Sequence, residues 1–172
     1  MTTWTTYESP LGRLTLHGDA RGLTALRFPG SGAPSGDAGR AEHVLAEAVR
    51  QLDEFFAGRR ARFDVALQLA GTPFQRAVWT RLLEIPYGTT ISYGAVAREL
   101  GRPDRVRAVA AAVGRTPVPI VVPCHRVIGA DGSLTGYGGG LDRKRWLLDL
   151  ERRGAGGRPP EPAWALRQLA LV

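Results

Sequence analysis

The sequence is poor in the residues that cross-link a chain or bind metal. Its 172 residues include one cysteine, Cys124, and three histidines. One cysteine cannot form a disulfide within the chain or build a thiolate metal cluster. No apolar run approaches the roughly 20 residues that cross a bilayer, and the N-terminus lacks the basic and then apolar stretch of a secretory signal. These absences predict a cytoplasmic protein whose thiol stays reduced.

Lysine is also scarce, since all but one of the 23 basic side chains are arginine. The net charge of +7 is unevenly spread: residues 1–71 carry 8 basic and 8 acidic side chains, whereas residues 72–153 carry 13 and 7. A basic half beside a neutral half favours a polyanionic partner such as nucleic acid. An arginine-rich genome and a solvated surface would explain the same charge, so charge alone does not decide.

Residues 1–69 predict a small N-terminal domain made of a sheet and one helix. Apolar and polar residues alternate over residues 2–28, which predicts two or three antiparallel strands, and again over residues 61–70, which predicts one more. Residues 40–58 show a helical period between them. We find no chemistry in this part: His17 and His43 lack a metal-ligand partner at a suitable spacing, so both are interpreted as structural.

Residues 70–153 predict a second domain built on three short helices joined by tight turns, as in a helix-turn-helix. Thr72 can cap the first helix, with Pro73 at its first position. Ser92 can cap the second, and the third begins near Pro103. A hairpin is predicted around Asp131 and a closing helix over residues 141–151, followed by a loose tail over residues 154–172.

The third helix is a candidate nucleic-acid surface. Its predicted core face consists of Val106, Val109, Ala110 and Val113. Alanines between two arginines allow close contact with groove walls and phosphates but offer few hydrogen bonds to bases, which predicts weak sequence preference. An ordinary alanine-rich helix is the alternative reading. The residues on the predicted outer face are Arg107, Ala108, Ala111, Ala112 and Arg115.

The cysteine lies in "PVPIVVPCHRVIG", residues 117–129. The apolar, β-branched residues before Cys124 predict a buried strand stiffened by prolines. A buried free cysteine is usually a small apolar side chain with an unreactive thiol. His125 favours a reactive thiol instead. Neighbours in an extended chain point to opposite faces, so contact between them requires a turn or a bridging water.

Glu151 is a candidate to orient His125, because it lies on the side of the closing helix that leans toward the core. A buried carboxylate needs a partner, and His125 would complete a relay of thiol, histidine and carboxylate. Surface pairing of Glu151 with Arg152 or Arg153 is the alternative that the sequence leaves open.

Three longer segments carry a family resemblance: "FQRAVWTRLLEIPYGTTISYGAVA" (74–97), "PCHRVIG" (123–129) and "GYGGGLDRKRWLLDLE" (136–151). Together they resemble the methylated-DNA–protein-cysteine methyltransferases, also called O6-alkylguanine-DNA alkyltransferases. The resemblance is dense over residues 72–151 and looser before them. It implies an α+β fold, in which a small antiparallel sheet with a helix precedes a winged helix-turn-helix domain that binds DNA and holds the active site.

The resemblance also implies roles for individual residues. Cys124 corresponds to the alkyl acceptor, His125 to a base acting through water, and Glu151 to the partner of that histidine. Tyr93 corresponds to a tyrosine that binds the phosphate 3′ to the lesion and protonates the guanine. Arg107 corresponds to an arginine that fills the stack when the base swings out. The other implied substrate contacts are the carbonyl of Val127, the pocket walls Pro119 and Tyr137, and the loop of Tyr137, Gly138 and Gly139, which closes over the base with the Gly138 amide near O6.

The chain departs from the family pattern at three points. Thr116 stands where the family usually has an asparagine, and a hydroxyl offers fewer hydrogen bonds than an amide. Gly138 stands where a serine can occur. The further cysteines of a zinc site found in some members are absent, so no metal is predicted.

The implied reaction is direct DNA repair. A guanine O6-alkyl carbon is buried in the duplex, so the base must first be flipped out. Transfer to Cys124 leaves a thioether, and nothing in the sequence would regenerate the thiol. We therefore predict one transfer per molecule without a cofactor. The predicted substrate is duplex DNA carrying O6-alkylguanine or O4-alkylthymine, and the protein is predicted to be a monomer. Cooperative binding along DNA stays open.

Three other functions make different demands on the sequence. A protein that binds alkylguanine without repairing it would lack the cysteine. A winged-helix regulator would need base-reading side chains on the third helix. A cysteine hydrolase would need an acyl pocket and would turn over repeatedly.

Overall fold

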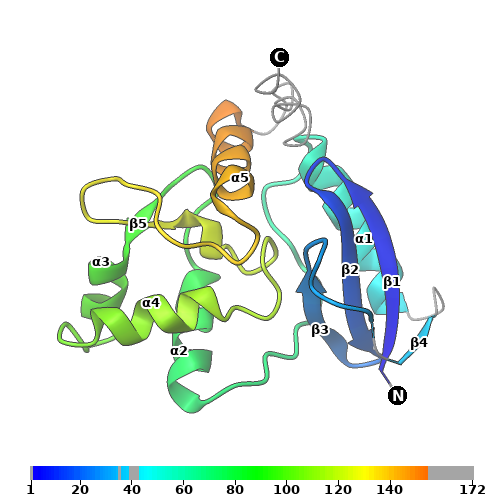
Figure 1. Cartoon of the computed structure of the whole chain (residues 1–172), viewed down its shortest axis with the longest axis horizontal. Coiled ribbons are helices and arrows are strands. Elements are labelled where there is room, and N and C mark those ends of the chain that lie inside the picture. Colours follow the sequence, from blue (N-terminus) through cyan, green and yellow to red (C-terminus); the bar gives the residue numbers. More distant parts are fainter. Residues whose placement is uncertain (1, 35, 39–42, 155–172) are drawn as a thin grey trace.

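The alternating N-terminal segments form the predicted strands in the computed structural model, which describes residues 2–34, 36–38 and 43–154 (Figure 1). Strand β2 (Gly12–Asp19) lies between β1 (Thr3–Ser9) and β3 (Gly22–Arg27) and is antiparallel to both. The β1–β2 register runs from Thr3 opposite Gly18 to Ser9 opposite Gly12. The short β4 (Asp37–Ala38) pairs in parallel with β1 and completes the order β3-β2-β1-β4.

Helix α1 (His43–Phe56) covers one face of this sheet (Figure 1). Its apolar stripe of Leu45, Leu52 and Phe55 is buried, as the helical period predicts. His43, at its start, is exposed, whereas His17 on β2 is buried. Burial, together with the charge of Arg27, lowers the pKa of His17.

The strand predicted over residues 61–70 forms only in part. Its backbone pairs with β3 at Leu23, whose N–H donates to the Ala66 carbonyl (2.8 Å) and whose carbonyl accepts from Gln68 N (2.9 Å). Further along β3, the N–H of Leu26 donates instead to the carbonyl of Pro117 (2.9 Å). The rest of this sheet edge is therefore used by the loop before Cys124, which the local sequence pattern could not reveal.

Two helices of the second part begin at the predicted caps. Helix α2 (Pro73–Leu82) has a reciprocal cap between Thr72 and Gln75, at 3.2 and 2.9 Å. The Ser92 hydroxyl accepts from Ala95 N (3.1 Å) at the start of α3 (Tyr93–Glu99). The helices α4 (Val106–Gly114) and α5 (Leu141–Arg153) follow.

The predicted core face of α4 is wrong in two positions. Val106 is 38% exposed, whereas Ala112, assigned to the outer face, is buried together with Val109 and Val113. The helix begins at Val106 rather than near Pro103, so its first turn projects beyond the core. Trp79 of α2 then donates its indole N–H to the Ala112 carbonyl (2.8 Å) and draws that side of the helix inward.

The hairpin predicted around Asp131 is also absent. A tight turn does form there, where Gly129 N donates to the Ser133 carbonyl (2.9 Å). Strand β6 (Val127–Ile128), however, pairs in parallel with β5 (Ile91–Ser92). The chain after the turn is held by α5 instead, since Lys144 donates to the Thr135 carbonyl (3.1 Å).

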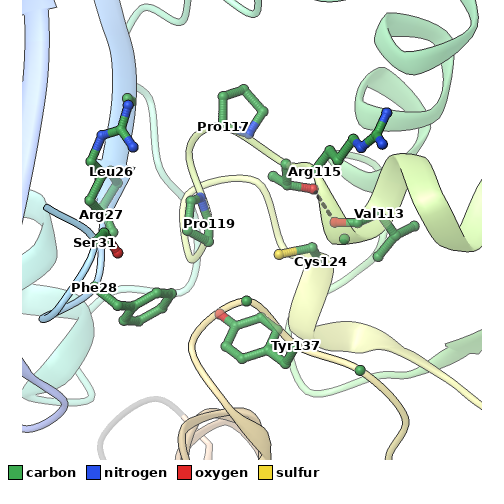
Figure 2. A pocket seen from close by; sticks show the side chains of 15 residues that line it. Leu26, Arg27, Phe28, Ser31, Val113, Arg115, Pro117, Pro119, Cys124 and Tyr137 are labelled. Carbon is green, nitrogen blue, oxygen red and sulfur yellow. Dashed lines mark hydrogen bonds between the residues drawn. The ribbon is translucent and has the colours of Figure 1, made fainter.

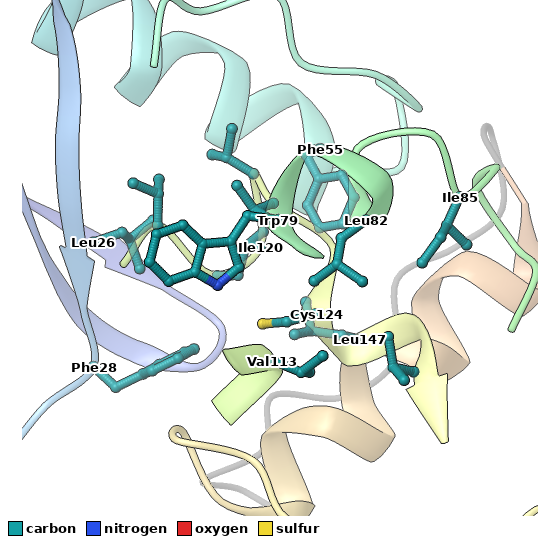
Figure 3. Packing of buried hydrophobic residues seen from close by; sticks show 14 of the residues in the cluster. Leu26, Phe28, Phe55, Trp79, Leu82, Ile85, Val113, Ile120, Cys124 and Leu147 are labelled. Atoms are coloured by element: carbon teal, nitrogen blue, oxygen red, sulfur yellow. The ribbon is translucent and has the colours of Figure 1, made fainter. Parts of the chain in front are cut away.

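One apolar core extends through both parts of the molecule (Figure 3). The rings of Phe56 on α1 and Trp146 on α5 lie 5.7 Å apart between centroids. In the part of the chain that the structure describes, every helix is too short or too polar to span a bilayer. The tail predicted to be loose falls, from residue 155 on, outside the described residues.

Candidate active site

The segment before Cys124 is a tight buried loop rather than the predicted strand. Val122 N donates back to the Val118 carbonyl (2.9 Å), which closes a turn. Ile120 within it is buried and has φ 75°, a conformation rarely adopted by a β-branched residue. Proline residues lack the backbone N–H that pairing with a neighbouring β-strand would need, so the chain turns instead. Packing against the surrounding core holds the strained loop in one shape.

Cys124 begins a short 3₁₀ turn, Cys124–Arg126, so Cys124 and His125 do not lie in the extended chain that would point their side chains to opposite faces. Both side chains are buried: Cys124 is 4% exposed and His125 0%. His125 Nε2 lies 2.7 Å from Glu151 Oε1, on α5. The contact between His125 and Glu151, one of the two alternatives for this carboxylate, is therefore present.

Arg126 completes the buried network. Its guanidinium donates to both carboxylate oxygens of Glu151, at 2.7 to 3.1 Å, and to the carbonyl of Ile85 (2.6 Å). Glu151 Oε2 also accepts from Gly88 N (3.2 Å). Burial alone would raise the pKa of Glu151, but the hydrogen bonds and charges of His125 and Arg126 outweigh it and lower that pKa to about 2.

An ionised Glu151 fixes the tautomer of His125. The carboxylate accepts, so Nε2 carries the hydrogen and Nδ1 keeps the lone pair. Nδ1 is buried and has no protein hydrogen-bond partner among the described residues. Burial lowers the pKa of His125, against the opposing effect of Glu151, so the imidazole is neutral at neutral pH and able to accept a proton.

Cys124 opens onto a cavity of about 310 Å³ between the two parts of the molecule (Figure 2). Burial raises the pKa of its thiol to about 11, and the Thr116 hydroxyl and the charge of Lys144 offset this only in part. The resting sulfur is therefore a thiol, which must lose its proton as it reacts. The cavity is lined by Ala25, Leu26, Arg27, Phe28, Ser31, Val113, Gly114, Arg115, Thr116, Pro117, Pro119, Cys124, Gly136, Tyr137 and Gly138.

A second cavity, of about 500 Å³, adjoins the first along Gly114 and residues 136–138. Tyr93 and Arg107 line it, and the Tyr93 hydroxyl donates to the Thr135 carbonyl (3.1 Å). Val106, freed from the core, lines it as well. The two cavities form a hollow that leads from the exposed side of α4 to the sulfur.

Other residues predicted for the site lie around this hollow or behind it. Ala111 is exposed on α4 and Ala108 is half-buried. Gly139 lines neither cavity and packs under the ring of Phe28. The Val127 carbonyl accepts from Lys144 Nζ (2.6 Å), which uses one of its two lone pairs. Thr116 donates to the Val113 carbonyl (2.7 Å), so the hydroxyl ties the end of α4 to the cysteine loop.

Sequence reasoning missed three contributors. Arg126 stands next to the recognised residues, and its position alone could have marked it as a partner for Glu151. Lys144, the single lysine, is fully buried, and burial lowers its pKa. Phe28 comes from the other part of the chain and carries no local signal. Among the described residues, no three His, Cys, Asp or Glu side chains gather as a metal site would require.

The raised pKa of Cys124 makes a direct prediction. An unperturbed thiol ionises near pH 8.5, so its alkylation by iodoacetamide levels off above about pH 9. With a pKa of about 11, the rate for Cys124 should still rise about tenfold per pH unit up to pH 10. Mass spectrometry of the cysteine peptide follows the reaction, with a small unstructured thiol peptide as reference. A plateau at or below pH 9 would contradict the burial argument.

Comparison with known families covers nearly the whole described chain. Residues 73–153 match the family described as 6-O-methylguanine DNA methyltransferase, DNA binding domain. Residues 2–69 match the family described as 6-O-methylguanine DNA methyltransferase, ribonuclease-like domain.

Individual relatives agree with these matches. The methylated-DNA–protein-cysteine methyltransferase of Mycolicibacterium paratuberculosis is 52% identical over 155 residues, which cover 89% of this chain and 94% of the relative. That of Methanosarcina acetivorans is 47% identical, covering 84% and 95%. A crystal structure of Mycobacterium tuberculosis OGT in complex with DNA superimposes with a TM-score of 0.82 at 49% identity, covering 87% of this chain and 92% of that one.

Proposed function

The chain belongs to the methylated-DNA–protein-cysteine methyltransferases, and we propose that it repairs O6-alkylguanine in duplex DNA by moving the alkyl group onto Cys124. The observation that carries this proposal is the buried arrangement of Cys124 at a cavity with the His125–Glu151 pair next to it in the fold. Residues 70–153 would form the domain that binds DNA and accepts the alkyl group, with residues 1–69 as the N-terminal domain.

The transfer is a displacement at the alkyl carbon. The carbon–sulfur bond to Cys124 forms while the bond between the alkyl carbon and O6 breaks. The thiol proton passes through a bridging water to Nδ1 of His125, whose positive charge Glu151 stabilises across the 2.7 Å contact. Tyr93 gives a proton to the departing guanine. The proton held by His125 then returns through solvent to Tyr93, so the net products are guanine and a thioether, and atoms and charge balance.

The hollow beside α4 suits a base that has been flipped out of the DNA duplex. Tyr93 and Arg107 line its outer cavity, and Cys124 lies in the inner one. Arg107 would fill the space that the flipped base leaves, which offsets part of a cost of a few kcal/mol. The exposed Arg115 and the small residues Ala108 and Ala111 would contact phosphates and groove walls with weak sequence preference.

The product decides how often one molecule can act. A thioether has no carbonyl for water to attack, unlike the thioester of a cysteine hydrolase, so the sulfur stays alkylated. We expect each molecule to remove one alkyl group and then stop. The test mixes the protein with a tenfold excess of duplex containing O6-methylguanine and counts lesions by mass spectrometry of digested DNA.

The expected result is one lesion lost per protein, with Cys124 heavier by one methylene unit. Duplex with unmodified guanine is the control and should leave the protein mass unchanged. Continued loss of lesions beyond one equivalent, or methylation at another residue, would overturn the proposal.

A further inference from the structure

The end of β3 reaches the cavity that holds the sulfur (Figures 2 and 3). The hydrogen bond from Leu26 N to the Pro117 carbonyl (2.9 Å) joins the strand to the loop that precedes Cys124. Two residues later, Phe28 is only 8% exposed and lines the cavity. The N-terminal sheet thus supplies part of the wall around the thiol.

The ring of Phe28 is contacted by two side chains of the second part, Tyr137 and Arg143. The ring of Tyr137 meets it edge to face, with centroids 5.7 Å apart and planes at 64°. The guanidinium of Arg143 lies 5.5 Å from its centroid and donates to the carbonyls of Leu11 and Gly139, both at 2.8 Å. These contacts fix the ring against both the sheet and the Tyr137 loop.

Gly139 shows how closely this packing fits. A Cβ at Gly139 would lie 2.8 Å from Cε2 of Phe28, nearer than real side chains approach. The loop of residues 136–140 therefore comes directly against the ring at Gly139. An alkyl group entering beside Cys124 therefore meets two rings, Tyr137 and Phe28, which line the same cavity and pack against each other (Figure 2).

We propose that Phe28 is a specificity-determining residue, which limits the size of the alkyl group that Cys124 accepts. The inference rests on the proposed transfer to Cys124, but it assigns the limit to a residue of the N-terminal part, directly after β3. A smaller, flexible side chain at this position would widen the cavity and let Tyr137 move, so bulky groups would gain more than methyl groups.

The experiment compares two duplexes of identical sequence, one with O6-methylguanine and one with O6-benzylguanine. Rates of Cys124 alkylation are measured by mass spectrometry for the full chain and for Phe28→Leu. The matched control is Phe63→Leu, since Phe63 is a partly buried ring that packs on Phe55 (5.2 Å) but does not line the Cys124 cavity. The quantity of interest is the benzyl rate divided by the methyl rate.

Phe28→Leu should raise this ratio about tenfold or more, the scale of discrimination that a few methylene groups produce in an apolar pocket. Phe63→Leu should leave it unchanged. A ratio that stays the same or falls in Phe28→Leu overturns the inference while the unmodified chain still becomes alkylated. If the unmodified chain gains no alkyl mass from either duplex, the proposed function itself fails.

Circular dichroism and a thermal melt establish that each variant is folded. Should Phe28→Leu fail to fold, Phe28→Met keeps an apolar side chain of similar reach with greater flexibility. The same rise in the ratio is expected for it, and an unchanged ratio in folded Phe28→Met counts against the inference equally.

Discussion

Replacing Cys124 with serine should abolish removal of the O6-alkyl group while leaving a folded protein that still binds the lesion. The hydroxyl nearly matches the thiol in size, so the cavity keeps its shape. An alcohol is a far weaker nucleophile toward an alkyl carbon, and His125 is no strong base. We expect a loss on the order of 10⁶-fold, as when the nucleophile of a hydrogen-bonded relay is removed.

Two measurements check this result. Remaining O6-methylguanine is quantified in duplex treated with each protein, and fluorescence anisotropy reports binding of the labelled duplex. Cys124→Ala is the control for the added hydroxyl, and it should behave like the serine variant in both assays. Lesion removal by Cys124→Ser would show that the acceptor lies elsewhere, and the proposed function would have to be withdrawn.

Local signals in the sequence predicted the elements that carry the site. Thr72 and Ser92 cap α2 and α3 as expected, because a cap depends on residues only three positions apart. The inward face of α5, with Trp146, Leu147 and Leu150 buried, follows from helical periodicity in the same way.

Most of the errors fall where distant segments compete for the backbone. The hairpin around Asp131 did not form, because β5 pairs with β6 and Lys144 holds the chain beyond the turn. The strand before Cys124 became a loop for a local reason, because its prolines lack N–H donors and Val122 N bonds back to the Val118 carbonyl. The strand predicted over residues 61–70 pairs with β3 only in part, because the Leu26 N–H of β3 donates to the Pro117 carbonyl instead. The partners of β6 and of the Leu26 N–H lie far away in the sequence, so local pattern alone favours the wrong element there.

The candidate site shows the same division. Cys124, His125 and Glu151 could be named from residue chemistry and from the family resemblance. The wall formed by Phe28 could not, since it depends on how the two halves of the chain pack. Arg126 stands beside the recognised residues and could have been named as a partner for Glu151, although its contact with both carboxylate oxygens shows only in the structure. Ala112 was wrongly assigned to the outer face of α4, because the hydrogen bond from Trp79 to its carbonyl is a tertiary contact that the local sequence does not show.

Replacing Glu151 with glutamine should both destabilise the protein and slow the transfer. The carboxylate is almost fully buried and pairs with the guanidinium of Arg126, so its loss leaves a buried charge without its counter-charge. Breaking such a pair from one side costs about 3–5 kcal/mol of the free energy of unfolding. His125 also loses the group that orients it and stabilises its protonated form, which should reduce the transfer rate by about 10²- to 10⁴-fold.

The matched control is Asp149→Asn on the same helix, where Asp149 pairs with Arg152 (2.8 Å) at the surface. Its loss should change the unfolding free energy by less than about 1 kcal/mol and leave the transfer rate unaltered. Urea unfolding and single-turnover kinetics, measured where both variants are folded, separate the two effects. If folded Glu151→Gln transfers at the normal rate, Glu151 is structural and not part of the relay.

Acid should reduce the extra unfolding free energy that the Glu151 carboxylate gives the native protein over Glu151→Gln. The pKa of Glu151 falls from an ordinary value of 4.5 to about 2 on folding. Below pH 4.5 Glu151 therefore binds a proton in the unfolded chain but not yet in the folded chain. The free energy of unfolding falls until the pH nears 2. Glutamine has no such proton to bind, so the gap in unfolding free energy between the native protein and Glu151→Gln should be widest near neutral pH and shrink between pH 4.5 and 2. A gap that stays constant over this range would mean that Glu151 is not held as a buried carboxylate between His125 and Arg126.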